Sequence, residues 1–169
     1  MSVPGKDQAA AYYFTYIDRV PEADIVGVME RQLGDASKLF STIPEEKSLH
    51  RYAPEKWSIR QTLNHISDTE RAFAFRALWF GRGFTDPLAG FDQNISVSEA
   101  RADEYGWARH VAEFADVRRA SLALFRNFPT EAWKRSGVAS GNLVTVNALA
   151  YIITGHFAHH MAILQKRYL

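Results

Sequence analysis

Apolar residues recur every three to four positions over four stretches of the chain, which is the spacing of amphipathic helices. The four stretches are residues 23–43, 58–80, 98–127 and 142–169. No segment shows the sustained alternation of apolar and polar residues that is typical of a half-buried β-strand. The pattern predicts an all-α protein, built as a four-helix bundle.

Residues at the helix starts agree with these bounds. Ser58 and Gln61 match the capping box, in which the serine hydroxyl accepts a hydrogen bond from a free backbone N–H and the glutamine reaches back. Ser98 and Asn142 are typical N-cap residues for the third and fourth helices. Three of the four predicted helices therefore begin at a recognisable cap.

Residues 81–97 connect the second and third helices. This segment carries four large apolar residues, which is too many for a solvated linker. We read its turn at residues 90–94 as loop, in which Asp92 hydrogen-bonds to nearby backbone rather than reaching over a site. The sequence predicts a long, ordered loop here, with room for a crossover connection.

Length, composition and charge narrow the class of protein. The 169 residues suffice for one continuous core, so we expect a single domain over residues 1–169. Hydrophobic residues make up 47% and charged residues 23%, the usage of an ordinary folded protein. The net charge is +1 and the basic residues are dispersed, which argues against nucleic acid as a partner.

Two absences in the sequence limit the chemistry and the location. The chain has no cysteine, which excludes disulfides, thiolate metal ligands and a thiol nucleophile of its own. Its start does not resemble a secretory signal, and no apolar run reaches membrane-spanning length. We therefore expect a cytoplasmic protein with no membrane partner.

Three histidines lie within five residues in the otherwise apolar stretch GHFAHHMAIL, residues 155–164. His156 and His160 are one turn apart on the inward face, about 6 Å along the axis, so both rings can reach one ion. His159, three residues from His156, is the alternate second ligand. Taken alone, such a pair is more often two core histidines that hydrogen-bond to a hydroxyl or carbonyl.

A histidine on the second helix strengthens the metal interpretation. His65 lies on the inward stripe of residues 59–73, so a third imidazole points into the bundle. Burying three titratable rings together is costly unless a divalent cation binds their neutral forms. Three neutral ligands also leave part of the coordination shell open, as in catalytic zinc sites, where a bound water or thiolate is activated.

Three segments together resemble the DinB-like superfamily of four-helix-bundle metalloenzymes. They are RYAPEKWSIRQTLNHISDTERAFAFRALWFGRG, PLAGFDQN and VNALAYIITGHFAHHMAILQKRYL, and the resemblance spans essentially the whole chain. It implies that His65, His156 and His160 bind a divalent metal, usually zinc or nickel. It also implies a metal-dependent transferase or isomerase that uses a low-molecular-weight thiol, and a homodimer.

Two positions depart from the family pattern. Gln61 and Phe157 stand where members of the superfamily usually carry glutamate. If either carboxylate relays protons or orients a metal ligand in those proteins, that role is missing here.

Other residues near the predicted site have competing explanations. Asp68 and Thr69 lie one turn beyond His65 and either orient its ring, bind substrate, or are ordinary surface polar groups. We expect a structural role for Glu70 and Arg76, either as an ion pair or through a bridge from Glu70 to the loop.

Aromatic residues and the remaining histidines are assigned from their positions. Trp57 precedes the cap and should pack against the helix entry. The N-terminal aromatic residues cover the core, line a pocket or form a dimer surface; they are Tyr12, Tyr13, Phe14 and Tyr16. His50 and His110 fall off the inward stripes and are predicted to lie on the surface.

Two functions fit these patterns. The first is an enzyme whose metal activates an external thiol, or water, for transfer to a small electrophile. The alternative is a non-catalytic, stress-related protein that binds a metal or a small ligand. A carboxylate-bridged di-iron centre is excluded, because it needs Glu-x-x-His pairs and the chain contains none.

Overall fold

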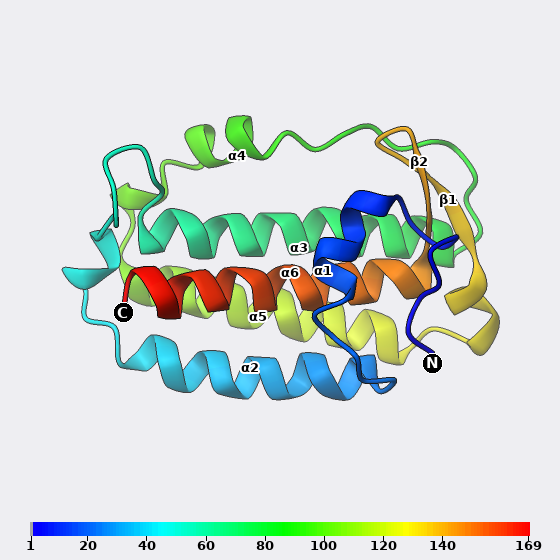
Figure 1. Ribbon diagram of the computed structural model, residues 1–169, viewed down its shortest axis with the longest axis horizontal. Coiled ribbons are helices and arrows are strands. Elements are labelled where there is room, and N and C mark those ends of the chain that lie inside the picture. The colour runs from blue at the N-terminus through cyan, green and yellow to red at the C-terminus, as the bar shows by residue number, and fades with distance from the viewer. Residues whose placement is uncertain (1) are drawn as a thin grey trace.

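Four long helices lie side by side in the computed structural model, which describes residues 2–169 (Figure 1). They are α2 (Ile25–Ser41), α3 (Ile59–Gly81), α5 (Trp107–Arg126) and α6 (Val146–Arg167). This arrangement confirms the predicted four-helix bundle. The shorter elements are α1 (Phe14–Ile17), α4 (Gln93–Ala100), β1 (Ser136–Ala139), β2 (Asn142–Thr145) and four 3₁₀ turns, at Ala11–Tyr13, Lys47–Leu49, Ala102–Glu104 and Thr130–Lys134.

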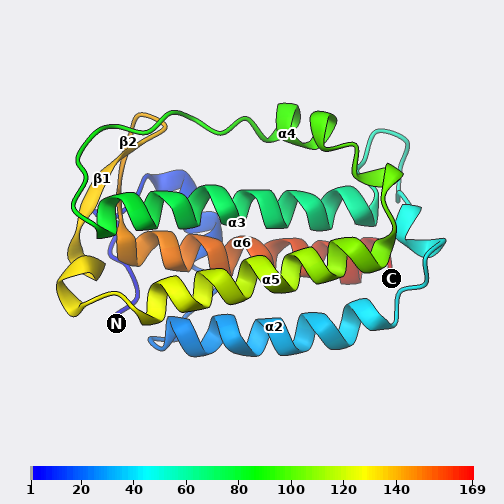
Figure 2. The ribbon, with the colours of Figure 1, turned by 180° about the vertical axis from the view of Figure 1, so that it is seen from behind.

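The connection between α3 and α5 is a crossover, as its length allowed. α3 and α5 begin at the same end of the bundle and run in the same direction, and the chain between them returns along the outside of α3 (Figures 1 and 2). α2 and α6 run the opposite way. α3 packs against both α5 and α6, which explains why so many of its residues are buried.

The capping box at the start of α3 is present as predicted. The Ser58 hydroxyl accepts from the Gln61 backbone N–H at 3.0 Å, and the Gln61 side-chain oxygen accepts from the Ser58 backbone N–H at 3.1 Å. These two bonds satisfy backbone donors that a helix start leaves without partners. The cap fixes the register from which His65 points into the bundle.

The predicted third helix begins later than Ser98. Residues 98–100 end α4, whose N-cap is Asp92, and a 3₁₀ turn follows before α5 starts at Trp107. The helix cannot continue through Arg101, because this residue has a left-handed backbone with φ of 50°. Asp92 accepts hydrogen bonds from the backbone N–H groups of Asn94 and Ile95, as expected, but it caps a short helix that begins within the predicted loop.

The predicted fourth helix also begins later, because residues 136–145 form a β-hairpin. β1 and β2 pair antiparallel from Ser136 opposite Thr145 to Ala139 opposite Asn142. The turn residues Ser140 and Gly141 both have positive φ, which is the geometry of a two-residue hairpin turn. Asn142 therefore lies in a strand, and the cap of α6 is Thr145, whose hydroxyl accepts from the Ala148 N–H.

His110 is buried, so its predicted surface position was wrong. It is 3% exposed, and its Nε2 lies 2.8 Å from the carbonyl oxygen of Ala102, in the 3₁₀ turn that precedes α5. That turn was not foreseen from the sequence. His50 is exposed, as predicted.

The N-terminal segment packs directly on α6 at Gly155. A Cβ atom at this position would lie 2.1 Å from the carbonyl oxygen of Tyr16, so only glycine permits the contact. The close approach places α1 across the middle of α6, next to His156 (Figure 1). Among the described residues, no helix combines the length and apolar character that crossing a bilayer requires.

Candidate metal centre

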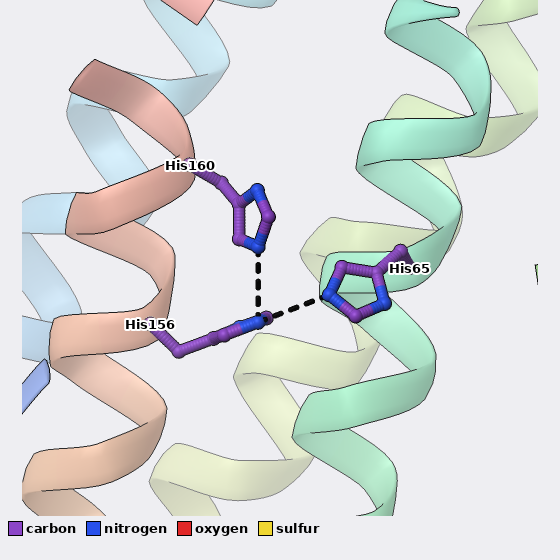
Figure 3. A group of neighbouring side chains, drawn as sticks. All are labelled: His65, His156 and His160. Atoms are coloured by element: carbon purple, nitrogen blue, oxygen red, sulfur yellow. Dashed lines mark hydrogen bonds between the residues drawn. The ribbon is translucent and has the colours of Figure 1, made fainter. Parts of the chain in front are cut away.

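His65, His156 and His160 meet between α3 and α6 (Figure 3). The Nε2 atom of His156 lies 3.1 Å from the Nε2 atom of His65 and 3.1 Å from that of His160. One potential ligand atom from each ring lies within 4.8 Å of the others. The structure thus brings together the three histidines that the sequence singled out, and their binding of a metal stays a prediction.

His159, the alternate ligand, is not part of this group. It is half-buried, and its ring lies against Tyr16 with the ring centres 5.6 Å apart. Of the two candidates for the second ligand on α6, His160 is therefore the one that joins the group. It lies four residues from His156, and its ring turns toward α3.

Burial keeps all three rings in the neutral form. It lowers the pKa of His65 to about 4, and with the neighbouring histidines it lowers the pKa of His160 to about 3. The pKa of His156 falls well below its ordinary value, first through burial and then through His160 and His65. Neutral imidazole is the form that binds a metal ion.

The donor set fits a divalent cation better than it fits a hydrogen-bonded cluster. The Nε2 atom of His156 has either one proton or one lone pair, so it cannot make good hydrogen bonds to both neighbours. A shared cation uses the lone pairs of all three rings. Two nitrogens at zinc-binding distance and a tetrahedral angle lie about 3.3 Å apart. This is close to the 3.1 Å between the Nε2 atom of His156 and that of each of the other two histidines.

Two neighbours hold the His65 ring in place. The Thr69 hydroxyl lies 3.3 Å from Nδ1 of His65, and the Trp57 ring packs on the imidazole with the ring centres 4.8 Å apart. The hydroxyl accepts the Nδ1 proton when Nε2 serves as the ligand atom. Asp68 does not contribute, because its carboxylate binds Arg71 and Ser96 instead.

Replacing Thr69 with valine should weaken metal binding about tenfold, because valine keeps the shape but removes the oxygen that fixes the ring. A competition titration against a coloured chelator measures the change. Thr69→Ser keeps the hydroxyl and is the matched control. Equal affinities for the wild type and the valine variant would show that Thr69 does not orient His65.

A cavity of about 190 Å³ lies beside the histidines. His156 and Thr69 line one part of it, and three residues of the N-terminal aromatic segment, Tyr12, Tyr13 and Tyr16, line another. The ring centres of Tyr16 and His156 are 5.2 Å apart. Two of the three roles predicted for the segment are therefore confirmed, because its tyrosines line the cavity and Phe14 is buried in the core, with Tyr13 and Tyr16 packed against it.

Glu70 and Arg76 do not form the predicted ion pair. Six residues apart on a helix, they lie on different faces of α3. Glu70 binds the guanidinium of Arg118 on α5 through both carboxylate oxygens, at 2.9–3.1 Å. Arg76 instead contacts the loop and the hairpin turn and lines the cavity, a role that the sequence analysis missed.

The two positions that depart from the family pattern are occupied by structural contacts. Gln61 belongs to the capping box, and Phe157 is buried and stacked on Phe114 with the ring centres 5.3 Å apart. Neither residue lines the cavity. The cavity lining contains no aspartate or glutamate.

Comparison with known families decides the classification. The model of the DinB superfamily matches residues 29–164, which include all three histidines. The chain belongs to the DinB superfamily. No curated protein matches it by sequence.

Two solved structures share this DinB fold at low sequence identity. YfiT from Bacillus subtilis is described as a probable metal-dependent hydrolase with an unusual four-helix bundle topology. It is 15% identical, with a TM-score of 0.71, over 98% of this chain and 93% of its own. A mycothiol-dependent maleylpyruvate isomerase is 12% identical, with a TM-score of 0.68, over 84% of this chain and 60% of its own.

Proposed function

We propose that this DinB protein is a metal-dependent enzyme that activates a low-molecular-weight thiol, or water, for attack on a small electrophile. The observation that carries the proposal is the meeting of three neutral imidazoles, two of them buried and that of His160 half-buried, beside a cavity. His65, His156 and His160 would hold the ion, with zinc or nickel as the expected metal. The metal-dependent and mycothiol-dependent descriptions of the two structural neighbours support this class of chemistry.

When bound, a divalent cation lowers the pKa of a thiol or water that reaches its open positions. The chain's own residues orient the ion and the reactants. Thr69 and Trp57 hold the ring of His65, and aromatic side chains line the cavity beside His156.

The tyrosine hydroxyls supply hydrogen bonds in the cavity. The hydroxyl groups of Tyr12 and Tyr16 lie 2.9 Å apart, so one donates to the other and a second O–H is left to donate to a bound molecule. Burial, followed by the bond to Tyr12, raises the pKa of Tyr16, and its hydroxyl therefore stays protonated.

Turnover tests the proposal. Protein loaded with zinc or nickel is mixed with cysteine, glutathione or mycothiol and with 1-chloro-2,4-dinitrobenzene, from which a thiolate displaces chloride. Hydrolysis of 4-nitrophenyl acetate tests water as the nucleophile. We expect many turnovers per bound ion with one of these pairs, and none after His156→Ala.

The missing carboxylate favours a second candidate, a non-catalytic protein that binds a metal or a small ligand. Without an acidic residue in the cavity, proton transfer depends on solvent or on the substrate. Tight metal binding with no turnover in any of these assays would support this candidate and contradict the enzyme. A homodimer and a cytoplasmic location remain expectations from the sequence.

A further inference from the structure

Arg76 differs from the other buried arginines of the described chain. Arg60, Arg76 and Arg118 are each at most 5% exposed. Arg118 forms an ion pair with Glu70 and Arg60 forms one with Glu45, but no carboxylate of residues 2–169 pairs with Arg76. Burying an unpaired guanidinium is costly, so buried arginines normally have an anionic partner.

The hydrogen bonds of Arg76 leave most of its donors free. Nη2 donates to the carbonyl oxygen of Ala89 at 3.1 Å and to the Ser140 hydroxyl at 3.0 Å. A guanidinium has five N–H donors, and those on Nε and Nη1 have no partner among the described residues. Neither nitrogen is sealed from solvent, because Arg76 lies on the wall of the cavity.

The free donors share this cavity with the histidine cluster. Thr69 and Arg76 lie two turns apart on one face of α3, about 10 Å along the axis. Thr69 contacts His65, and both Thr69 and His156 line the cavity that Arg76 also lines. A molecule held at Arg76 therefore extends toward the proposed metal ion.

The hairpin turn adds a second polar group at this end. Ser140 has a φ of 53°, a left-handed conformation that is uncommon for residues other than glycine. Its backbone N–H donates to the carbonyl oxygen of Leu88, and its hydroxyl accepts from Arg76. The hydroxyl proton is left to donate to an anion beside the guanidinium.

The walls between the two ends are largely aromatic, with Tyr13, Phe73 and Phe91 among the lining residues. One guanidinium and one hydroxyl match a singly charged carboxylate. A phosphate dianion usually needs more positive charge or several backbone N–H groups. The cavity thus favours a carboxylic acid with an apolar body.

We propose that the cavity binds a small organic acid, with its carboxylate at Arg76 and Ser140 and its reactive carbon toward His156. Only the orientation toward His156 rests on the proposed function. The carboxylate subsite itself is built from residues of α3 and the hairpin and does not require the metal.

Benzoate binding to metal-free protein tests the subsite. After treatment with EDTA, calorimetry or NMR titration measures the affinity of benzoate, and of benzamide as its uncharged counterpart. Arg76→Gln should weaken benzoate binding about tenfold or more, since a charge-assisted hydrogen bond is lost. Arg82→Gln removes the same charge from an exposed position at the end of α3 and should leave the affinity unchanged.

A second measurement on the wild type does not depend on a folded variant. Benzoate should shift the Nε–H NMR signal of Arg76 and leave that of Arg118 in place. Equal affinity for benzoate and benzamide, equal affinity in the wild type and Arg76→Gln, or tighter binding of inorganic phosphate would overturn the proposal. The benzoate titration uses metal-free protein, so its result is independent of the turnover assays on metal-loaded protein. Benzoate binding together with no turnover in those assays would reject the proposed enzyme and keep the subsite.

Discussion

Replacing Glu70 with alanine should lower the free energy of unfolding by about 3–5 kcal/mol, because it leaves the Arg118 guanidinium buried without an anion. The side chain of Arg118 is fully buried and that of Glu70 is 2% exposed. Without Glu70, the guanidinium keeps its bonds to the Gln32 side chain, at 2.8 Å, and to the Met29 carbonyl oxygen. Neutral acceptors cannot compensate for the lost charge. Urea unfolding followed by circular dichroism measures the change.

The surface pair between Glu30 and Arg126 is the matched control. Its atoms lie 2.7 Å apart, but both side chains are about half exposed or more, so Glu30→Ala should cost less than about 1 kcal/mol. Adding Arg118→Met to Glu70→Ala should restore most of the lost stability, because the unpaired charge is then gone. A Glu70→Ala variant as stable as Glu30→Ala would contradict the structural role assigned to the buried pair.

Replacing His156 with alanine should weaken metal binding at least about a hundredfold, more than the loss of a residue that only orients a ligand. His156 is the central ring of the group, since its Nε2 atom lies 3.1 Å from the Nε2 atoms of both other histidines. Elemental analysis gives the metal content, and competition with a chelator gives the affinity. His65→Ala and His160→Ala should have similar effects.

His159→Ala is the control for this series, because it removes a neighbouring imidazole of α6 that lies outside the group of three. It should keep full metal content and an affinity within about threefold of the wild type. Full metal content in any two of the His65, His156 and His160 variants would contradict the assignment of the ligands.

The helical periodicity of the sequence was enough to predict the bundle and the inward position of the three histidines. Positions three and four residues apart on a helix share a face. The apolar stripes therefore placed His65 on the inward face of α3, and His156 and His160 on the inward face of α6. The capping box at Ser58 fixed the start of α3 within one residue. Both conclusions depend only on local spacing, which a single sequence contains.

Features that depend on short or distant contacts were missed. The strands of the hairpin have only four residues each, too few for a clear alternation. The left-handed backbone of Arg101 has no signal in the sequence, and it displaced the predicted start of the third helix. Glu70 was paired with Arg76 because they are near in sequence, whereas its partner Arg118 is 48 residues away.

The walls of the cavity were also beyond sequence analysis, since they come from parts of the chain that meet only in the folded protein. Tyr16 reaches His156 from the N-terminal segment, and Ser140 reaches Arg76 from the hairpin. One local signal was present: Gly155 lies in the middle of a helix, where glycine is unfavourable unless another backbone approaches closely. The structure shows that approach, by the backbone of Tyr16.

The most direct test of the proposed metal site is anomalous X-ray diffraction at the zinc or nickel edge. The crystals are grown from protein purified without a nickel column and supplied with a molar excess of the metal. We expect one strong peak between α3 and α6, about 2.0–2.1 Å from the Nε2 atoms of His65, His156 and His160. The absence of a peak among these three nitrogens, in crystals that received the metal, would contradict the proposed site.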